Sequence, residues 1–554
     1  MPSVADAIVR SLHDAGVATL FGVPGGGSNL DLIEAAAHAG LPFVLTATET
    51  AAALAALAQA ELTGRPGACL TALGPGAASV VGGVACASLD RAPLLIFTDA
   101  HPSSSDGAFE HQRIDHAALL APIVKWSATI DAEHADETMR RAIACATCGP
   151  PGPVHVECPA DVTTRPAFSS LPVARAFQAG GDQAGGDQAG GDQAGGDQAS
   201  GHQATDPGPR SAESLALQAL RKPLLIAGLG ARRAEDAAAI RTFCESRNVP
   251  AMVTYKAKGV VPDDDPHFAG VFTNGAIERP IVEQADLLLG VGLDPVELLP
   301  RPWTYTQPIL ACGRWRVDDR HVPFAAQLVG HIAEELQDLA VRLPRSAWDL
   351  EALRTTVAGQ RERLRVESDQ LTADRVVRVA SRMAPDARVT VDAGAHMFPA
   401  TMLWRVIRPN DMLISNGLST MGFALPAAIG AALIDRERPV VALIGDGGLL
   451  MCVGELLTAV REQLHIIVVV FSDGMLSLID VKQRQHRYSS RGVTLGGVRW
   501  ASIAESFRMP AYAATTDREL EQALSEAVSR RGPTLVDARI DPASYDAMLK
   551  TVRG

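Results

Sequence analysis

Short apolar runs that end in glycine or aspartate recur along this chain and constrain its fold more than any other feature. They include "PLLIFTD" (93–99), "PLLIAGLG" (223–230), "ADLLLGVG" (285–292), "PVVALIGDG" (439–447) and "HIIVVVFSDG" (465–474), and Ala-rich helical segments separate them. Continuous apolar strands that alternate with helices indicate parallel sheets covered on both faces. The sequence therefore predicts an α/β protein of doubly wound parallel-sheet domains, in which ligands bind beyond the carboxyl ends of the strands.

A five-residue repeat of Ala, Gly, Gly, Asp and Gln interrupts this pattern between residues 179 and 203. The repeat has no apolar face to bury, so it predicts a flexible linker rather than a packed element. A softer boundary is the charged helical stretch that begins at Leu350. The sequence therefore predicts three domains in series, at 1–165, 211–345 and 376–554. The linker at 166–210 joins the first to the second, and a helical connection at 346–375 joins the second to the third.

Composition narrows the class of partner. The chain has 554 residues, a net charge of −13 and no run rich in Lys or Arg, which argues against nucleic acid or an anionic membrane and favours a small molecule. No stretch reaches the roughly 18 apolar residues of a membrane span, and the N-terminus resembles an amphipathic helix rather than a signal peptide, so we expect a cytoplasmic protein. Of eight cysteines only Cys145 and Cys148 form a CxxC, and no further ligands complete a metal site.

Two aspartates follow consecutive predicted strands. Asp446 lies between Gly445 and Gly447 at the end of one apolar run, and Asp473 ends the next run 27 residues later. If this segment is a strand, a helix and an adjacent parallel strand, both carboxylates emerge at one sheet edge. There they could hold a hard cation that bridges to a phosphorylated ligand. The spacing alone also fits two acids in ordinary βα loops, so it needs support from other motifs.

Five further segments give that support, in chain order: "FGVPGGGSNLDLIEA" (21–35), the stretch from "ATETAAALAALAQAELTG" to "LLIFTD" (47–99), "GPVHVECPADV" (152–162), "TYKAKGVVPDDDP" (254–266) and "NGLSTMGFALPAAIGAAL" (416–433). With the "GDG" motif they resemble the thiamine diphosphate enzymes over nearly the whole chain, and most of all the acetolactate synthase-like group. The resemblance implies a pyrimidine-binding, a central and a diphosphate-binding domain. It also implies a homo-oligomer with active sites at the dimer interface, between the first domain of one subunit and the third of another.

The resemblance assigns the proton chemistry to Glu49 in "TATETAAALAA". Thiamine's C2 is a weak carbon acid, and the family's glutamate hydrogen-bonds the aminopyrimidine so that its amino group can take the C2 proton. Glu49 is the one acid between Glu34 and Glu61 and stands among small and apolar residues, so we expect burial to raise its pKa and keep it a proton donor. Without the resemblance, an acid at a helix start is an ordinary N-terminal residue.

The same resemblance assigns cofactor and metal contacts. Met421 corresponds to the apolar wedge that bends the cofactor, and Mg²⁺ is expected on the side chains of Asp446 and Asp473 and the backbone carbonyl of Met475. Asp473 replaces a common Asn, which adds a negative charge beside the diphosphate but remains a suitable ligand for a hard cation. The remaining cofactor-binding positions implied are Gly26, Gly76, Gly394, His396, Gly417, Ser419, Gly445, Gly447 and Gly448.

The substrate-facing positions depart from acetolactate synthase. In "AFEHQRIDH" (108–116), Gln112 lies where the family has a Gln that lines the site, His111 replaces a usual Phe, and Arg113 replaces a usual Glu. His111 could act as an acid or base, as in decarboxylases with histidines near this point, or could simply be solvated. Leu73 makes the pocket apolar where related decarboxylases can place a His.

In acetolactate synthases the central domain carries FAD in a structural role, near a segment that reads like "GxRFDDR". This chain has "GVGLDPVELLPRPW" (290–303) instead, so the acids and the arginine are displaced or absent. The glycine turn "GLGARR" (228–233) could serve a nucleotide, although such a turn often merely connects a strand to a helix. Binding of FAD by the central domain is therefore possible, but the sequence argues against it.

We therefore expect a thiamine diphosphate- and Mg²⁺-dependent enzyme that decarboxylates a pyruvate-like 2-oxo acid and joins the remaining carbon unit to an acceptor, as acetolactate synthases do. A non-oxidative 2-oxo acid decarboxylase that releases an aldehyde is the alternative. A non-catalytic relative that kept the fold is a third reading. The presence of Glu49 favours an enzyme, since loss of this residue is the usual route to loss of the chemistry.

Overall fold

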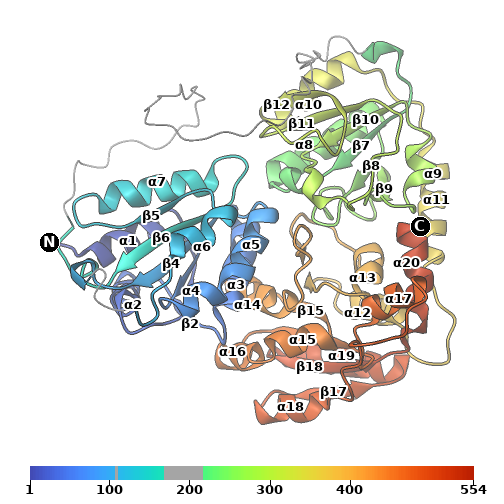
Figure 1. Ribbon diagram of the computed structural model, residues 1–554. Helices are drawn as coiled ribbons and strands as arrows, with labels where there is room; N and C mark the ends of the chain where they lie inside the picture. The colour runs from blue at the N-terminus through green and yellow to red at the C-terminus, as the bar shows by residue number, and fades with distance from the viewer. Residues whose placement is uncertain (106–109, 168–215) are drawn as a thin grey trace.

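The computed structural model describes residues 1–105, 110–167 and 216–554. Within them lie three six-stranded sheets, one after another along the chain, whose strand pairings are parallel. The predicted α/β class, with three parallel-sheet domains in series, is confirmed, and Figure 1 shows the three as separate lobes. The repeat predicted to be a flexible linker (179–203) lies outside the described residues.

The first sheet has the strand order β2-β1-β3-β4-β6-β5. On β3, Ala68 and Leu70 join one core cluster with α1, α2 and α7, whereas Cys69 joins another with α3 and α5, so helices cover both faces. The elements are β1 (Leu20–Val23), β2 (Phe43–Leu45), β3 (Gly67–Thr71), β4 (Leu94–Ala100), β5 (Ser127–Thr129), β6 (Pro153–Pro159), α1 (Val4–Asp14), α2 (Ser28–Ala39), α3 (Glu49–Thr63), α4 (Pro75–Ser79), α5 (Val81–Leu89), α6 (His116–Leu120) and α7 (Ala135–Thr147).

The central sheet has a different order, β12-β11-β10-β7-β8-β9, which is that of a dinucleotide-binding fold with its switch point between β7 and β10. Helix α11 (Leu350–Glu362) then leads towards the third domain. The elements are β7 (Pro223–Ala227), β8 (Ala251–Val253), β9 (Phe268–Val271), β10 (Leu287–Val291), β11 (Ile309–Gly313), β12 (Phe324–Val329), α8 (Ala234–Arg247), α9 (Arg279–Val282) and α10 (Ile332–Arg342).

The third sheet, β14-β13-β15-β16-β18-β17, repeats the order of the first. Its elements are β13 (Arg388–Val391), β14 (Met412–Ile414), β15 (Val440–Gly445), β16 (Ile466–Ser472), β17 (Ala511–Ala514), β18 (Thr534–Arg539), α12 (Ala373–Met383), α13 (Met397–Leu403), α14 (Ala424–Ile434), α15 (Asp446–Cys452), α16 (Glu455–Arg461), α17 (Ser477–Gln485), α18 (Trp500–Ser506), α19 (Asp517–Arg530) and α20 (Tyr545–Arg553). Strands β15 and β16 are neighbours, as the proposed pairing of the two aspartates requires.

Two Ala-rich helices join the first and third domains. Helix α3 lies beside α14, and a Cβ on Gly430 of α14 would lie only 2.2 Å from the carbonyl oxygen of Ala55. Gln59 of α3 donates a hydrogen bond from Nε2 to the Gly430 carbonyl at 3.2 Å. Because α3 is buried along most of its length, its sequence is apolar all round instead of amphipathic.

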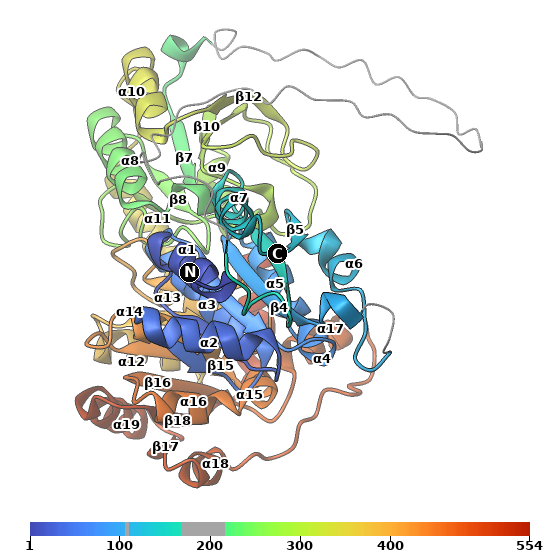
Figure 2. The ribbon, with the colours of Figure 1, turned by 90° about the vertical axis from the view of Figure 1, so that its left-hand side faces the viewer.

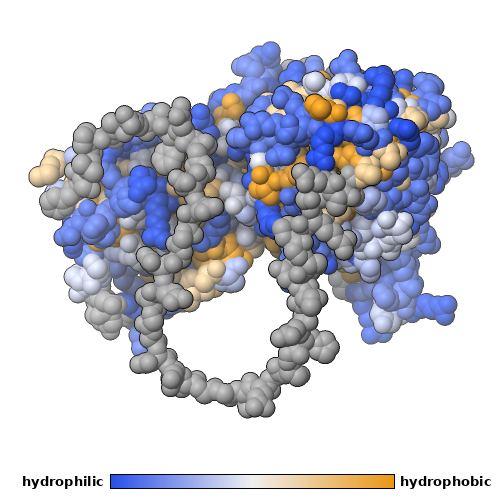
Figure 3. Space-filling view, turned by 90° about the horizontal axis from the view of Figure 1, so that it is seen from above, coloured by the Kyte–Doolittle hydropathy of each residue, from blue (hydrophilic) through white to orange (hydrophobic). Residues whose placement is uncertain are grey.

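Figure 2 shows the central domain above the other two. Seen from above, the surface is mostly hydrophilic, with hydrophobic residues in scattered patches (Figure 3). Across the described ranges, no helix combines the length and the apolar character needed to cross a membrane.

Candidate functional site

The two aspartates predicted to share a sheet edge do so. Strand β15 ends at Gly445 and pairs with β16, so Asp446 and Asp473 follow directly after neighbouring strands. Asp446 Oδ2 accepts hydrogen bonds from the backbone N–H groups of Gly474 (2.7 Å) and Asp473 (3.3 Å). Its Oδ1 accepts one from Gly447 at 2.8 Å. The juxtaposition predicted from the spacing is therefore confirmed.

Burial opposes the charge of this acid pair. Burial first, and the Asp446 carboxylate after it, raise the pKa of Asp473 to about 6, against hydrogen bonds from Ser477 Oγ (2.5 Å) and the Met475 N–H (3.0 Å). Burial also raises the pKa of Asp446. The described residues hold no cluster of three His, Cys, Asp or Glu side chains, so a cation here would need further oxygens, such as the Met475 carbonyl.

Glycines keep the turn beside the acid pair free of side chains. A Cβ on Gly448 would lie 2.0 Å from Asp392 Oδ2, and one on Gly447 would lie 2.6 Å from Leu476 Cδ2. The same Gly447 position is 3.4 Å from Met421 Cε, so the residue predicted to be the wedge reaches this turn. Only glycine lets the backbone come this close to its surroundings.

His396 lies at the same edge with an unpartnered nitrogen. Its ring stacks on Phe471, with the centroids 4.9 Å apart, and Cβ atoms on Gly394 and Gly445 would lie 2.7 and 3.3 Å from its Cε1. Burial lowers the pKa of His396 to about 4, against a hydrogen bond with the Leu443 backbone, so the imidazole is neutral and carries a single N–H. Nε2 is buried and has no hydrogen-bond partner among the described residues. Since buried polar atoms are normally paired, this nitrogen is a candidate for contact with a ligand.

Asp392, at the end of β13, is a site residue that sequence reasoning missed. Its carboxylate accepts hydrogen bonds from the backbone N–H groups of Gly422 (3.0 Å), Phe423 (2.6 Å) and Ala424 (3.1 Å), which fixes the loop before α14. Burial raises the pKa of Asp392 to about 7, against these three donors. The signal was present, because "RVTVDAG" also ends an apolar strand in an acid and a glycine.

Two predicted cofactor-binding residues take other positions. Gly417 donates its N–H to Asp90 Oδ1 at 2.8 Å, and a Cβ on it would lie 2.7 Å from Leu89 Cβ in the first domain. Ser419 is exposed, with a positive φ of 53°. Gly417 therefore serves domain packing in this chain, and direct cofactor contacts of both residues remain predictions.

Glu49 is the first residue of α3, after its N-cap Thr48, and lies at the carboxyl edge of the first sheet. Its Oε1 adjoins the short helix α4, where a Cβ on Gly76 would lie 3.1 Å away. The sequence predicted burial, but a single chain leaves Glu49 half-buried. The alanines that suggested burial enter the core from Ala51 onwards, whereas Glu49 and Thr50 at the start of α3 stay half-buried at the sheet edge.

A glycine loop follows β1 at this edge. Asp99, near the end of β4, accepts hydrogen bonds from the N–H groups of Gly27 (3.1 Å) and Ser28 (2.9 Å) and so fixes the loop. Gly26, predicted to contact the cofactor, has no described atom within 4 Å of its Cβ position and therefore faces open space. Sequence reasoning did not single out Asp99, although it also ends an apolar run.

Gln112 lies against the turn that contacts Glu49. A Cβ on Gly74 would lie 2.6 Å from the Gln112 carbonyl oxygen, and both residues have positive φ, of 62° and 57° respectively. His111 is exposed, and its carbonyl oxygen accepts a hydrogen bond from His101 Nε2 at 2.9 Å. These contacts engage only the backbone of His111, so its acid–base role remains a prediction.

Sequence reasoning also missed the pair formed by the buried His116 and the half-buried Glu157. His116 Nε2 accepts the Gly74 N–H at 3.0 Å, which leaves its proton on Nδ1, and Nδ1 lies 3.0 Å from Glu157 Oε1. The contact with His116 lowers the pKa of Glu157, so its carboxylate is ionised at neutral pH. Both residues line a cavity of about 250 Å³ at the ends of β4, β5 and β6, together with Leu73 and Gln112.

One chain keeps Glu49 and the acid pair apart. Ala47 and Thr48, just before Glu49, donate their N–H groups to Glu455 Oε1 at 2.9 and 3.2 Å. Glu455 begins α16, directly beyond the end of α15, whereas Asp446 is the first residue of α15. Glu49 and the acid pair thus lie towards opposite ends of α15.

The switch point of the central sheet is closed. The Gly230 N–H donates to the Gly292 carbonyl at 2.9 Å, and a Cβ on Gly228 would lie 2.5 Å from the same oxygen. Glu297 Oε2 accepts the Leu229 N–H at 2.8 Å, so the chain's own carboxylate occupies the glycine turn. The cavity lined by Gly230, Gly292 and Trp315 is about 10 Å³, so this crevice by itself is too small for a nucleotide, and FAD binding by the domain stays a prediction. A larger hollow of about 560 Å³ lies outside this crevice, between the first and central domains.

Comparison with known proteins gives matches along most of the chain. Residues 2–119 match the N-terminal TPP binding domain of thiamine pyrophosphate enzymes, 215–339 their central domain and 392–538 their C-terminal TPP binding domain. The chain is 29% identical to the catabolic acetolactate synthase of Raoultella terrigena, over 97% of this chain and 95% of that protein. It is 27% identical to the acetolactate synthase of Bacillus subtilis, over 97% and 93%. It is 30% identical to a probable 2-ketoarginine decarboxylase of Pseudomonas aeruginosa, over 97% and 94%.

Proposed function

Because this chain belongs to the thiamine pyrophosphate enzyme family, we propose that it decarboxylates a pyruvate-like 2-oxo acid and joins the remaining carbon unit to an acceptor, in the manner of the acetolactate synthases among its relatives. One observation carries the proposal. The carboxyl edge of the third sheet presents the unpartnered Nε2 of His396 beside two carboxylates, those of Asp446 and Asp473, whose pKa values burial raises. Such an edge fits an anionic ligand that arrives together with a cation.

The residues at this edge fit a diphosphate group. Gly445, Gly447 and Gly448 leave room for close approach of a ligand, and the tautomer of neutral His396 that carries its single proton on Nε2 would donate to a phosphate oxygen. Met421 lies over the glycine turn, where a bent cofactor needs an apolar contact. When bound, thiamine diphosphate supplies the electron sink for decarboxylation.

Mg²⁺ is the cation that we propose for the acid pair. Two carboxylates and the backbone carbonyl of Met475 are hard oxygen ligands, and Mg²⁺ commonly takes one or two carboxylates together with the phosphates of its partner ligand. A cation would also relieve the repulsion that contributes to the raised pKa of Asp473.

Glu49 would hold the proton at the cofactor's pyrimidine ring. Its half-buried carboxylate and the open face at Gly26 lie at the free edge of the first sheet. Since Asp446 lies towards the other end of α15, we propose a homo-oligomer in which the third domain of a second copy covers Glu49 and completes its burial. This would leave the acid protonated and shielded from water.

A second candidate is a decarboxylase that releases an aldehyde from a 2-oxo acid with a longer, polar side chain. The cavity of about 250 Å³ beside Gln112 favours it, because pyruvate presents only a methyl group. Glu157 lines this cavity with its carboxylate ionised, which suits a side chain that donates hydrogen bonds. A probable 2-ketoarginine decarboxylase is among the relatives.

Product analysis separates the two candidates. The protein would be loaded with thiamine diphosphate and Mg²⁺ and given pyruvate, longer aliphatic 2-oxo acids and 2-oxo acids with a terminal amine or guanidine. Acetolactate from pyruvate supports the first candidate, and aldehyde from a polar donor supports the second. If no donor releases CO₂ while the cofactor is bound, both are wrong.

Glu49→Gln tests the proton chemistry directly. The variant should still bind the cofactor but should exchange the C2 proton about 10²–10⁴-fold more slowly, because the amide cannot transfer a proton to the pyrimidine. Hydrogen–deuterium exchange at C2, followed by NMR, measures this step without substrate. Glu34→Gln, an exposed acid on α2, is the control and should exchange at the normal rate. Normal exchange in Glu49→Gln would remove Glu49 from the mechanism.

A further inference from the structure

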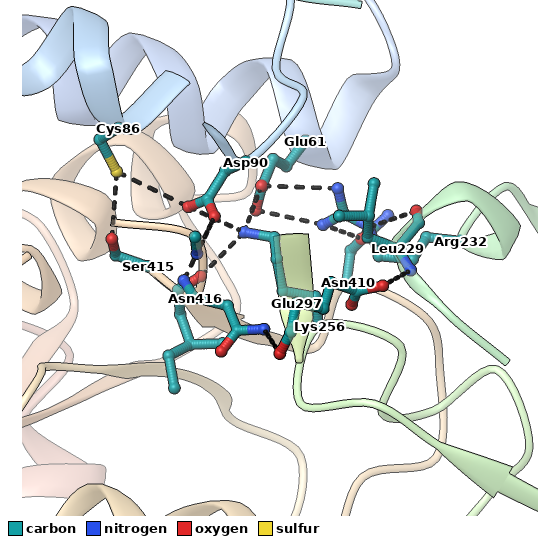
Figure 4. Close-up of polar contacts among 12 residues, drawn as sticks. Glu61, Cys86, Asp90, Leu229, Arg232, Lys256, Glu297, Asn410, Ser415 and Asn416 are labelled. Atoms are coloured by element: carbon teal, nitrogen blue, oxygen red, sulfur yellow. Dashed lines mark hydrogen bonds and ion pairs between the residues drawn. The ribbon is translucent and has the colours of Figure 1, made fainter. Parts of the chain in front are cut away.

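The three domains meet at a buried ammonium group (Figure 4). Lys256, in the turn after β8 of the central domain, places Nζ 2.6 Å from Glu61 Oε1 and 3.2 Å from Asp90 Oδ2. Glu61 is on α3 and Asp90 follows α5, both in the first domain. The same Nζ donates to the carbonyl oxygen of Ile414, the last residue of β14 in the third domain, at 2.8 Å. A single side chain therefore contacts all three domains.

The charges around Lys256 balance. Arg232 NH1 lies 3.2 Å from Glu61 Oε2, so two cations face two carboxylates. The side chains of Lys256, Glu61 and Asp90 are at most 1% exposed. Burial disfavours the ammonium, but Asp90 and Glu61 outweigh it and raise the pKa of Lys256, which stays protonated. Removal of one member would leave a buried charge without a partner.

This cluster holds the start of the loop that carries Met421. Asp90 Oδ1 accepts hydrogen bonds from the N–H groups of Gly417 (2.8 Å) and Asn416 (3.2 Å). Asn416 Nδ2 donates to the carbonyl of Glu297 in the central domain at 2.9 Å. The loop is thus fixed to both other domains at its beginning.

The end of the same loop is fixed separately, inside the third domain. Asp392 accepts the N–H groups of residues 422–424. Met421 stands between the two attachments, with Cε 3.4 Å from the Cβ position of Gly447. The place of Met421 over the glycine turn therefore depends on both ends of the loop.

We infer that Lys256 is a positioning residue for the cofactor cleft: by holding Ile414 and Asp90 it fixes the start of loop 414–424 and thereby sets where Met421 lies over Gly447. The central domain then takes part in cofactor binding without contact with the cofactor. The inference rests on the proposed function in one respect, that this cleft binds thiamine diphosphate. Figure 4 shows Asp90, Glu61 and Lys256 gathered where the three domains meet.

Lys256→Met tests this role, since it keeps the side chain's bulk and removes the ammonium. The dissociation constant for thiamine diphosphate with Mg²⁺, measured by quenching of tryptophan fluorescence, should rise about tenfold or more. Lys258→Met is the matched control, because Lys258 is equally buried and pairs with Asp263 at 3.1 Å, away from the loop. It should lower the melting temperature to a similar extent and leave the dissociation constant unchanged.

The outcomes are distinct. An unchanged dissociation constant in Lys256→Met, or an equal rise in both variants, overturns the inference. If Lys256→Met does not fold, Asn416→Ala tests the inference instead. This change removes the hydrogen bond from the loop to the central domain and leaves no buried charge without a partner. This variant should melt like the wild type and bind the cofactor about threefold more weakly, and unchanged binding contradicts the inference. A wild-type protein that binds no thiamine diphosphate contradicts the proposed function itself, before any variant is compared.

Discussion

The carboxyl edge of the third sheet and the switch point of the central sheet are similar places with opposite contents. Both lie where parallel strands end in glycines, the usual position of a ligand in such folds. At the third sheet, His396 Nε2 has no hydrogen-bond partner among the described residues. Burial is the largest of the causes that raise the pKa of Asp473 to about 6. At the central switch point, Glu297 accepts the Leu229 N–H and about 10 Å³ remains.

This difference shows which features indicate a ligand. Strand order favours the central domain, whose sheet has the dinucleotide-binding arrangement, and glycines occur at both places. Among the described residues, the third-sheet edge keeps two acids together against the effect of burial, beside a buried His396 nitrogen that has no hydrogen-bond partner. The central sheet also has a buried polar atom without a partner in the described ranges, the Tyr255 hydroxyl after β8, so the acid pair, and not strand order or glycines, distinguishes the ligand site here.

Asp446→Ala should give the largest effect on the third-sheet edge. It removes one of the two predicted carboxylate ligands of the metal, and since even residues that only support a ligand cost ~10–100-fold, affinity for thiamine diphosphate with Mg²⁺ should fall at least about 100-fold. Titration calorimetry with and without Mg²⁺ measures this loss. Asp541→Ala, which changes an acid after β18 of the same sheet, should leave affinity intact. Full affinity in Asp446→Ala would show that the acid pair holds no metal.

Gly228→Ala tests whether the central switch point is a packed core. The added Cβ would lie 2.4 Å from Leu293 Cα, and overpacking of this kind costs about 1–3 kcal/mol. Thermal unfolding should show the loss, while cofactor affinity stays unchanged. Gly359→Ala within α11 is the control, because its Cβ would meet no described atom within 4 Å and the change should stabilise the helix. Weaker cofactor binding in Gly228→Ala would mean that the crevice is in use.

The sequence was sufficient to predict which site residues lie together wherever the pairing of neighbouring strands fixes their positions. Asp446 and Asp473 could be paired in advance because a strand, a helix and a parallel strand bring their ends to one edge. Asp392 and Asp99 were missed although each follows the same strand-end pattern, because the pattern does not say which N–H groups an acid will accept. The enclosure of Glu49 was overestimated, since a single chain does not provide it.

Contacts between distant segments could not be predicted from the sequence. Lys256 meets Glu61 and Asp90 from another domain, and no local period marks such a partner. The same holds for His116 and Glu157, which come from the start of helix α6 and from strand β6, 41 residues apart. Burial of these groups is decided by how whole domains pack, and this is the part of the site that needed a structure.

His396→Phe should have a smaller effect and tests the unpartnered nitrogen. Phenylalanine keeps the stack on Phe471 and removes the donor, so cofactor affinity should fall about tenfold. The protein without cofactor should be as stable as before or more stable, since a buried polar atom without a partner is lost. His465→Phe is a matched control: its Nε2 is also buried and unpartnered, but it lies at the amino end of β16. An equal loss of cofactor affinity in both variants would show that His396 does not contact the cofactor.

Asp473→Asn should give the smallest effect, a pH-dependent change in stability. Without a cation, the folded wild type holds Asp473 with a pKa of about 6, above the ordinary 3.8. Between these values the folded state binds a proton that the unfolded state has released, so wild-type stability falls as the pH rises through this range. The variant has no such group. In EDTA it should therefore melt about 2–4 °C above the wild type at pH 7.5 and show little difference at pH 4.

Addition of Mg²⁺ with thiamine diphosphate should reverse the order at pH 7.5, because the charged pair then has its counterion. A pH-independent difference would mean that burial at this edge does not oppose the charge of Asp473. The raised pKa values of the acid pair would then no longer distinguish this edge from the central switch point.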